Sequence, residues 1–327
     1  MHLKILPLLA LCLLLSITAF AQKQNVYYMK NDGRQVSTTD SADFIRVISE
    51  PDSGSTLYNW KEYYPSGKVK LIGKSSHINP PVAEDQCVTF FPSGKRKEVA
   101  TYKTGAKTGE IFNYYPNGTL YTVKQVTPVS KVLYDAINQE YIISSTNDST
   151  GKALVVDGNG YYLGFDDEFK YIAEEGNLKA GLRDGDWKGQ EIDKEGKITF
   201  IERYDNGKSQ GGQSVDGTRN VINYTSRVIN PEFPGGEEAF GKFLQRNIKY
   251  PARARERNIQ GKIYISFVVE KDGSLTDIKI IRDPGGGLGD EGVRVLKLSP
   301  NWVPGLRFGR PMRMLYTVPI NFSLGYQ

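Results

Sequence analysis

The stretch that most constrains the fold lies near the carboxyl end, where apolar and polar residues alternate over residues 262–270. A period of two is typical of a strand with one buried face. Asp272-Gly273 follows and favours a tight turn, because both residue types tolerate positive φ. A second β-rich run over residues 275–281 predicts the return strand. The side chains predicted to face the core are Ile263, Ile265, Phe267 and Val269.

Three short helices and a last strand are predicted around this hairpin. The first helix opens at Glu237, where an acidic residue suits the helix dipole. The second spans residues 252–258 behind a proline, and the third spans residues 290–298 and stops before Pro300. Residues 312–323 alternate again and predict a strand. Its buried face would carry Met314, Tyr316, Val318, Ile320 and Phe322.

A proline, Pro319, lies within this last predicted strand. Proline has no N–H to give to a β-ladder and is therefore confined mostly to edge strands. An exposed edge is either protected against pairing or used for it. Pro319 and nearby Arg313 fit simple protection, whereas the alternative is that an extended peptide from a partner adds to the edge. The residues leave both interpretations open.

Four segments of this region resemble the C-terminal domain of TonB, the periplasmic energy transducer of Gram-negative bacteria. They are Tyr250-Pro251-Ala252-Arg253-Ala254, Ile259-Gln260-Gly261-Lys262-Ile263, Val268-Val269-Glu270-Lys271-Asp272-Gly273 and Trp302-Val303-Pro304-Gly305. The resemblance covers roughly the last hundred residues. It implies a small αβ domain over residues 227–327, with a three-stranded antiparallel sheet and short helices.

The same resemblance implies a partner. TonB-like domains bind the TonB box, a short segment of outer-membrane transporters, by pairing it against the last strand. The partner would then be a TonB-dependent outer-membrane transporter, and a homodimer formed by strand exchange stays open. Carried over, the partner-binding residues are Lys249, Tyr250, Pro251, Met312, Arg313, Met314, Leu315, Tyr316, Thr317, Val318, Ile320 and Phe322.

A repeated pattern precedes this domain. Tyr63-Tyr64-Pro65-Ser66-Gly67-Lys68 returns 27 residues later as Phe90-Phe91-Pro92-Ser93-Gly94-Lys95, and 24 residues after that as Tyr114-Tyr115-Pro116-Asn117-Gly118-Thr119. Such spacings are typical of stacked repeats. We expect an antiparallel β-hairpin array over residues 22–226, with its aromatic residues mostly in the core. The pattern resembles the bacterial MORN-type repeat, and the whole chain is predicted to be α+β.

Two stretches do not follow the repeat. Residues 132–179 fit it badly, although Tyr161-Tyr162 and Phe165 resemble a degenerate copy. Residues 206–236 are rich in Gly, Ser, Asn and Pro, and they are predicted to be the linker. The domain boundary is placed near Ser226.

The amino terminus predicts a secretory signal peptide over residues 1–21. Lys4 supplies the positive start, residues 5–15 the apolar centre, and Ala19-Phe20-Ala21 the cleavage signature. Cleavage would leave a periplasmic protein. An uncleaved segment would anchor the chain in the inner membrane and add inner-membrane motor proteins as partners.

Two departures from the TonB transducers favour transporter binding over active energy transduction. Their anchor helix carries a histidine used for coupling to the motor, whereas the apolar run here has Ser16 but no histidine. They also carry a long proline-rich spacer, which repeats replace in this chain. The rival hypothesis is a structural or interaction protein whose partner binds the MORN-like array, with the TonB-like domain as a docking unit only.

Residues able to do chemistry are scarce. Beyond the signal peptide the chain has one histidine, His77, and one cysteine, Cys87, which is expected to be a buried apolar residue. A zinc site on His and Cys ligands needs more than these two, so no metal, no cofactor and no enzyme activity are expected. The net charge of +5 lies within residues 231–327, which carry 15 Lys and Arg against 10 Asp and Glu. That surplus is too dilute to indicate nucleic acid.

The six residues from Gly287 to Gly292 spell GxGxxG and imitate a dinucleotide-binding motif. Such a site needs an acidic residue about 20 positions later, and none follows Glu291. Asp290 and Glu291 would also repel a pyrophosphate at the helix start. The glycines are therefore interpreted as a flexible loop that leads into the helix.

Overall fold

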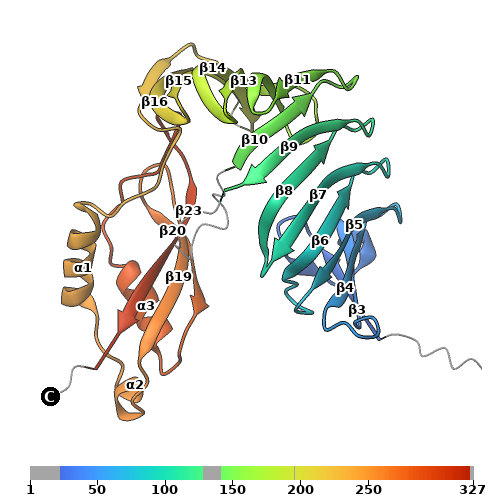
Figure 1. Ribbon diagram of the computed structural model, residues 1–327. Coiled ribbons are helices and arrows are strands. Elements are labelled where there is room, and N and C mark those ends of the chain that lie inside the picture. The colour runs from blue at the N-terminus through green and yellow to red at the C-terminus, as the bar shows by residue number, and fades with distance from the viewer. Residues whose placement is uncertain (1–22, 128–140, 195, 325–327) are drawn as a thin grey trace, which may run out of the picture. The chain divides into compact units, whose positions relative to one another are not determined.

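A computed structural model describes residues 23–127, 141–194 and 196–324 (Figure 1). The chain forms two compact units, unit 1 up to Asn159 and unit 2 from Gly160 onward. The signal peptide predicted over residues 1–21 lies outside the described residues.

Unit 1 is a succession of antiparallel strands, drawn from blue to green in Figure 1. Its elements are β1 (Gln24–Met29), β2 (Gln35–Val36), the 3-10 turn η1 (Thr39–Ser41), β3 (Phe44–Ser49), β4 (Tyr58–Tyr63), β5 (Val69–Ser75), β6 (Ala83–Phe90), β7 (Arg96–Lys103), β8 (Ala106–Tyr114), β9 (Leu120–Val126), β10 (Tyr141–Asn147) and β11 (Ala153–Val156). From β3 to β11 each strand pairs with the next one along the chain, and β1 pairs with both β2 and β3. The prediction of antiparallel hairpins is thus confirmed.

The aromatic-proline motif forms the same turn in each of its three copies. In the first, the N–H of Tyr64 donates to the carbonyl of Lys68, and the N–H of Gly67 donates back to Tyr64, both at 2.8 Å. The copies at Phe91 and Tyr115 repeat both bonds at 2.8 Å. The turn glycine has a φ of 78° at Gly67, where a side chain would be strained.

The same pair of bonds also closes two turns of unit 1 that lack the aromatic motif, over residues 30–34 and 148–152. In the second of these, the N–H of Asp148 donates to Lys152 at 2.8 Å and that of Gly151 donates to Asp148 at 3.0 Å. The stretch that fits the repeat badly in sequence therefore contains a turn closed by the same pair of bonds.

The second aromatic residue of the motif ties one hairpin to the next. The hydroxyl of Tyr64 donates to the carbonyl of Phe90 at 2.7 Å, and that of Tyr115 donates to the carbonyl of Asn147 at 2.9 Å. Cys87 is buried, as predicted, and burial raises the pKa of its thiol. The core of unit 1 is completed by buried apolar residues of successive strands, among them Ile48, Phe91, Ala100, Ile111 and Tyr121.

Unit 2 begins with a second run of antiparallel strands. These are β12 (Asn159–Phe165), β13 (Ile172–Lys179), β14 (Leu182–Asp193), β15 (Gly196–Asp205), β16 (Lys208–Val215) and β17 (Val221–Tyr224). Each pairs with the next. Trp187 is fully buried, with its ring centre 5.7 Å from that of Tyr162 and 6.2 Å from that of Tyr204.

The predicted linker over residues 206–236 is wrong, because it contains β16 and β17. Two of its glycines, Gly211 and Gly212, serve close packing. A Cβ on Gly211 would lie 2.6 Å from the carbonyl oxygen of Tyr224, and a Cβ on Gly212 would lie 2.6 Å from that of Ile201. The division into compact units after Asn159 does not test where a folding domain begins or ends. The domain limits 22–226 and 227–327 therefore stay a prediction.

The remainder of unit 2 contains the helices and two small sheets. Its elements are β18 (Val228–Ile229), α1 (Gly236–Asn247), α2 (Ala252–Glu256), β19 (Gly261–Val269), β20 (Leu275–Arg282), α3 (Leu288–Leu296), β21 (Leu306–Arg307), β22 (Arg310–Pro311) and β23 (Met314–Phe322). β19 lies between β20 and β23 in a three-stranded antiparallel sheet, and β18, β21 and β22 form the other. The predicted hairpin and last strand are confirmed.

One face of the β20-β19-β23 sheet is covered by the helices. The alternate residues predicted to face the core of β19 are all fully buried, and they share one cluster with Leu288 and Leu296 of α3. Phe240 and Leu244 of α1 pack against the same cluster. Helix α3 begins and ends two residues earlier than predicted, at Leu288 and Leu296. Across the described residues the chain is mostly antiparallel strand with few helices, so its class is β-rich rather than the predicted α+β.

Candidate functional site

The candidate site is β23, which lies at the edge of its three-stranded sheet. Only β19 pairs with it among the described residues, in a register that joins Tyr264 to Pro319 and Phe267 to Tyr316. Its side chains alternate as predicted: Val318, Ile320 and Phe322 are buried, while those between them are exposed. The structure thus brings Met314, Leu315, Tyr316, Thr317, Val318, Ile320 and Phe322 together on one edge strand.

Pro319 indicates which backbone groups of β23 face outward. Along a strand, the N–H and C=O groups of successive residues point to opposite edges. Pro319 lacks an N–H, so it fits a position whose backbone groups face away from β19. By alternation the backbone groups of Leu315 and Thr317 face the open edge, and those of Tyr316 and Val318 face β19.

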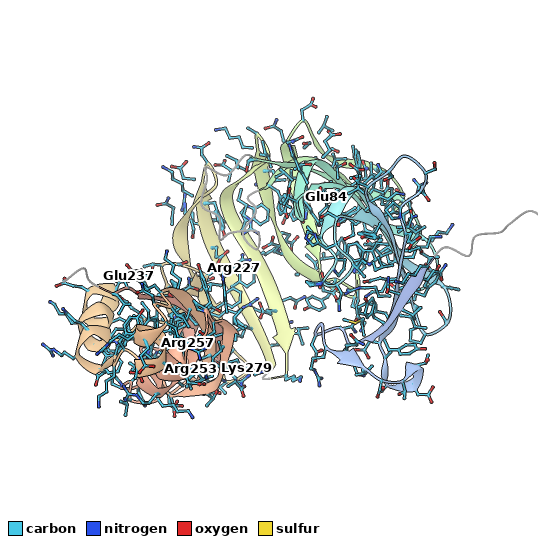
Figure 2. The ribbon with its side chains drawn as sticks, turned by 90° about the horizontal axis from the view of Figure 1, so that it is seen from below. Glu84, Arg227, Glu237, Arg253, Arg257 and Lys279 are labelled. Carbon is cyan, nitrogen blue, oxygen red and sulfur yellow. The ribbon has the colours of Figure 1, made fainter. Side chains whose placement is uncertain are left out.

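A hollow of about 260 Å³ lies beside this edge, and we refer to it as the β23 hollow. Strand residues 316–319 form one wall, and helix α1 forms another. Its apolar lining includes Phe233, Phe240, Leu244, Trp302, Tyr316 and Val318, and its polar lining includes Glu232 and Glu237. Figure 2 labels Glu237, at the start of α1.

The two predicted site residues before β23 are already engaged. The N–H of Met312 donates to the carbonyl of Gly305 at 2.9 Å. Arg313 pairs with Glu270 at 2.9 Å and with Asp277 at 2.7 Å. The hydrogen bonds to these two carboxylates raise the pKa of Arg313 above its usual value. Arg313 therefore bridges carboxylates of its own domain.

The predicted segment Lys249-Tyr250-Pro251 lies between α1 and α2 and is held by several contacts, among them one at Lys249 and one at the ring of Tyr250. The N–H of Lys249 donates to the carboxylate of Glu291 at 2.6 Å. That carboxylate also accepts from Arg294 at 2.7 Å, and the hydrogen bond from Arg294 lowers the pKa of Glu291. The ring of Tyr250 meets that of Phe322 edge-on, 5.8 Å apart, which places Tyr250 at the far end of β23. Whether this segment touches a partner stays a prediction.

The glycines of the GxGxxG run serve helix packing. Gly287 caps α3 with a φ of 89°, and both Gly289 and Gly292 lie inside the helix. A Cβ on Gly292 would lie 2.3 Å from the Cδ1 of Ile263, so glycine is needed where α3 meets β19. The expectation of a flexible loop is therefore wrong for Gly289 and Gly292.

A second set of residues, which the sequence did not predict, joins the β21–β22 hairpin to the β12–β17 strands of unit 2. The ring of Phe308 stacks on Phe200 at 4.8 Å and meets Tyr224 edge-on at 5.8 Å. The hydroxyl of Ser214 donates to the carbonyl of Phe308 at 2.9 Å. Arg310 donates to the carbonyl of Asn220 at 2.9 Å. We refer to Phe308 and its contacts as the hairpin plug.

An ion-pair network lies beside the hairpin plug. Glu202 is 1% exposed, and it accepts hydrogen bonds from Arg227, Tyr204 and Tyr224 (Figure 2 labels Arg227). Burial alone would raise the pKa of Glu202, but the hydrogen bonds and the charge of Arg227 outweigh it and lower that pKa. Arg227 also pairs with Glu174 at 3.1 Å. A signal was present in the sequence, since Glu202 precedes Tyr204 as Glu62 precedes Tyr64 in the repeat.

The geometry defines a small domain with helices on one face of its sheet and one open edge strand, the kind of edge to which extended peptides add. Residues 246–324 match the model of the family described as the Gram-negative bacterial TonB protein C-terminal. The chain therefore contains a TonB C-terminal domain, as its four sequence segments predicted. Such a domain indicates a TonB-like role in energy transduction at the cell envelope.

The other comparisons are negative. Neither the curated proteins nor the solved structures give a match to this chain. The MORN-type resemblance of the repeats stays a prediction.

Two further features are absent from the described residues. No helix within them has the length and apolar character to cross a membrane. Over the same part of the chain, no three His, Cys, Asp or Glu side chains gather as a metal site.

Proposed function

We propose that this protein binds the TonB box of an outer-membrane transporter by strand addition to the open edge of β23, in support of energy-coupled transport. The observation that carries the proposal is an edge strand with no partner on its outer side among the described residues, within a TonB C-terminal domain. Outer-membrane transporters are the partners that this family implies in general. The function is binding rather than catalysis.

Strand addition would draw its affinity from main-chain hydrogen bonds. The backbone groups of Leu315 and Thr317 would bond the added strand, and Pro319 would offer only its carbonyl. Because Leu315 is 71% exposed, its side chain has little packing to lose. Removing an outward N–H should therefore matter far more than removing this side chain.

The test is a titration of the whole chain with peptide copies of TonB boxes. We expect Thr317→Pro and Leu315→Pro each to weaken binding far more than Leu315→Ala. Both proline variants should retain the wild-type circular dichroism spectrum, because their N–H groups face away from β19. Equal losses for Leu315→Pro and Leu315→Ala would exclude strand addition.

The proposed location is the periplasm, with the predicted signal peptide over residues 1–21 removed. Sequencing the amino terminus of the mature protein tests this directly. A terminus near Gln22 supports a periplasmic adaptor that binds transporters. An intact Met1 would restore the inner-membrane anchor, and with it the inner-membrane motor proteins as partners.

A second candidate function is a MORN-like interaction protein whose partner binds unit 1. It is favoured by an apolar hollow of about 450 Å³ on β5–β8, lined by residues that include Ile72, Val88, Phe90, Phe112 and Tyr114. Ile72 is 41% exposed there. Affinity capture with Ile72→Glu and Thr317→Pro separates the two candidates, because each variant should lose only the partners of its own surface.

A further inference from the structure

The β23 hollow opens on the helix-covered face of the sheet, below the free edge of β23. Its wall residues Phe233, Phe240 and Trp302 belong to or pack against the core cluster that covers this face. Tyr316 and Val318 reach the hollow from the strand itself. The hollow thus lies on the helix-covered side of the sheet, next to the edge strand β23.

An added strand would place every second side chain on the helix-covered face of the sheet, and one of these side chains would lie over the hollow. Side chains of a strand alternate between the two faces of a sheet, and those on one face line up with same-face neighbours on the next strand. A peptide paired along residues 315–319 would therefore direct one residue into the space between β23 and α1. The volume suits an apolar group, since a cavity of about 150 Å³ lined by apolar residues already holds benzene.

The backbone alone offers this peptide a short ladder. Pro319 removes one outward donor from the middle of β23, so few main-chain bonds remain between Leu315 and the end of the strand. A side chain seated in the hollow would compensate by burying apolar surface.

The charges at the hollow restrict what enters. Glu232 and Glu237 line it, and no Lys or Arg does so among the described residues. An acidic side chain would leave water to face these carboxylates without a cation. The apolar lining favours an apolar residue, and the two carboxylates reject an acidic one.

We propose that the β23 hollow is a specificity pocket that reads one branched or aromatic apolar residue of the strand added to β23. This rests on the proposed function. Most of its wall, from residue 231 to 244, precedes the family match at residues 246–324, so the selectivity would be particular to this chain.

Gly241 allows the pocket to be filled without disturbing the core. It lies in α1 and lines the hollow, and a Cβ there would meet no atom within 4 Å. Gly241→Leu should occupy the hollow, whereas Gly241→Ala adds one methyl and serves as the matched control. Both replace a helical glycine and should keep or improve helix stability.

The probes are blocked seven-residue peptides of alternating threonine and alanine, with the central alanine kept or replaced by leucine or glutamate. On the unchanged chain we expect the leucine probe to bind about tenfold or more tightly than the alanine probe, and the glutamate probe most weakly. Gly241→Leu should reduce binding of the leucine probe to the level of the alanine probe. It should leave the alanine probe unchanged, and Gly241→Ala should preserve the preference.

Thr317→Pro separates this proposal from strand addition itself. If Thr317→Pro weakens the probes but leucine and alanine bind equally, the pocket is refuted and strand addition stands. If Gly241→Leu weakens the alanine probe as much as the leucine probe, the pocket is also refuted. Failure of every probe to bind the unchanged chain, while TonB-box peptides still bind it, would overturn the pocket alone. Failure of the TonB-box peptides as well would overturn the proposed function.

Discussion

Glu62 in unit 1 and Glu202 in unit 2 are both buried glutamates that lie two residues before a tyrosine, but they pair with different parts of the chain. Each lies five residues before a turn glycine, Gly67 or Gly207, and the two residues are only 4% and 1% exposed. A buried carboxylate is costly unless it is paired and hydrogen-bonded. Both positions must therefore be supplied with donors.

Glu62 obtains its donors from the strands of its own unit. Arg46 on β3 donates at 2.9 Å, the Nζ of Lys70 on β5 lies 3.4 Å away, and the indole of Trp60 donates at 3.3 Å. Two cations thus share one carboxylate.

Glu202 depends on a cation from outside the repeat strands. Arg227 follows β17 and leads into the TonB-like part of unit 2, and it is the one cation in the described part of the chain that pairs with Glu202. The other donors are the hydroxyls of Tyr204 and Tyr224. The comparison teaches that the buried Glu62 is paired by cations of its own strands, whereas the buried Glu202 is paired by an arginine of the segment that follows β17.

The largest difference in unfolding free energy is expected when the arginine that pairs with each glutamate is replaced. Arg227→Met leaves Glu202 buried without a cation and should cost about 3–5 kcal/mol of unfolding free energy. Arg46→Met should cost less, about 1.5–3 kcal/mol, because Lys70 still faces Glu62. Urea unfolding of both variants measures the two costs.

Glu202→Gln provides the control for this pair. In the Arg227→Met background it removes the unpaired charge and should recover part of the lost stability. Equal costs for the two arginine variants would show that Arg227 is not the sole support of Glu202.

Disrupting the hairpin plug should cause the next largest loss of unfolding free energy. Phe308 is 1% exposed between Phe200 and Tyr224, so Phe308→Ala should cost about 3 kcal/mol through lost burial and a cavity. Phe308→Leu keeps most of the volume and should cost less than about 1.5 kcal/mol. Hydrogen exchange should quicken in β16 and β17 of the alanine variant and stay unchanged in unit 1. Faster exchange in β3–β5 would contradict a plug that acts on unit 2 alone.

Much of the fold could be predicted from the sequence, because the features that specify strands and turns lie within a few neighbouring residues. The alternation of β19 and β23, the turn glycines and Pro319 at a sheet edge follow from backbone chemistry at those positions. The turn over residues 148–152 was missed because it keeps the glycine but lacks the aromatic pair. Residues 206–236 were misread because the small residues that a close-packed strand pair needs have the composition of a linker.

The contacts of Phe308 and Arg227 could not be predicted from the sequence, for a different reason. Phe308 meets Ser214 across 94 positions of chain, and no periodicity links residues so far apart. Glu202 itself carried a local signal, since it lies two residues before Tyr204 as Glu62 lies two residues before Tyr64. Its neighbour Arg227 carried none, because its role arises only when the chain leaves β17. The edge position of β23 was predicted, while the β23 hollow depends on where α1 packs.

The tyrosines two residues after the two glutamates extend the comparison, with smaller expected losses of unfolding free energy. Tyr64 donates to a neighbouring main-chain carbonyl, so Tyr64→Phe should cost about 0.5–1.5 kcal/mol. Tyr204 donates to the charged Glu202 at 2.9 Å, so Tyr204→Phe should cost about 1.5–3 kcal/mol. Thermal unfolding of the two phenylalanine variants ranks them, and a reversed order would mean that Glu202 does not need this hydroxyl.

The smallest expected effect is the part of the pH dependence of stability that arises from Glu202. Its pKa is lowered in the folded protein from an ordinary value of 4.5, so the charged form contributes stability above about pH 4.5. That contribution is lost as the pH falls through the folded pKa, at no more than about 1.4 kcal/mol per pH unit. Glu202→Gln has no proton to gain at this position, whereas carboxylates outside the Arg227 network titrate alike in both proteins. The stability gap between wild type and Glu202→Gln, measured by urea unfolding, should therefore narrow from pH 7 to pH 3.5, and a constant gap would mean that Arg227 does not hold Glu202 in its charged form.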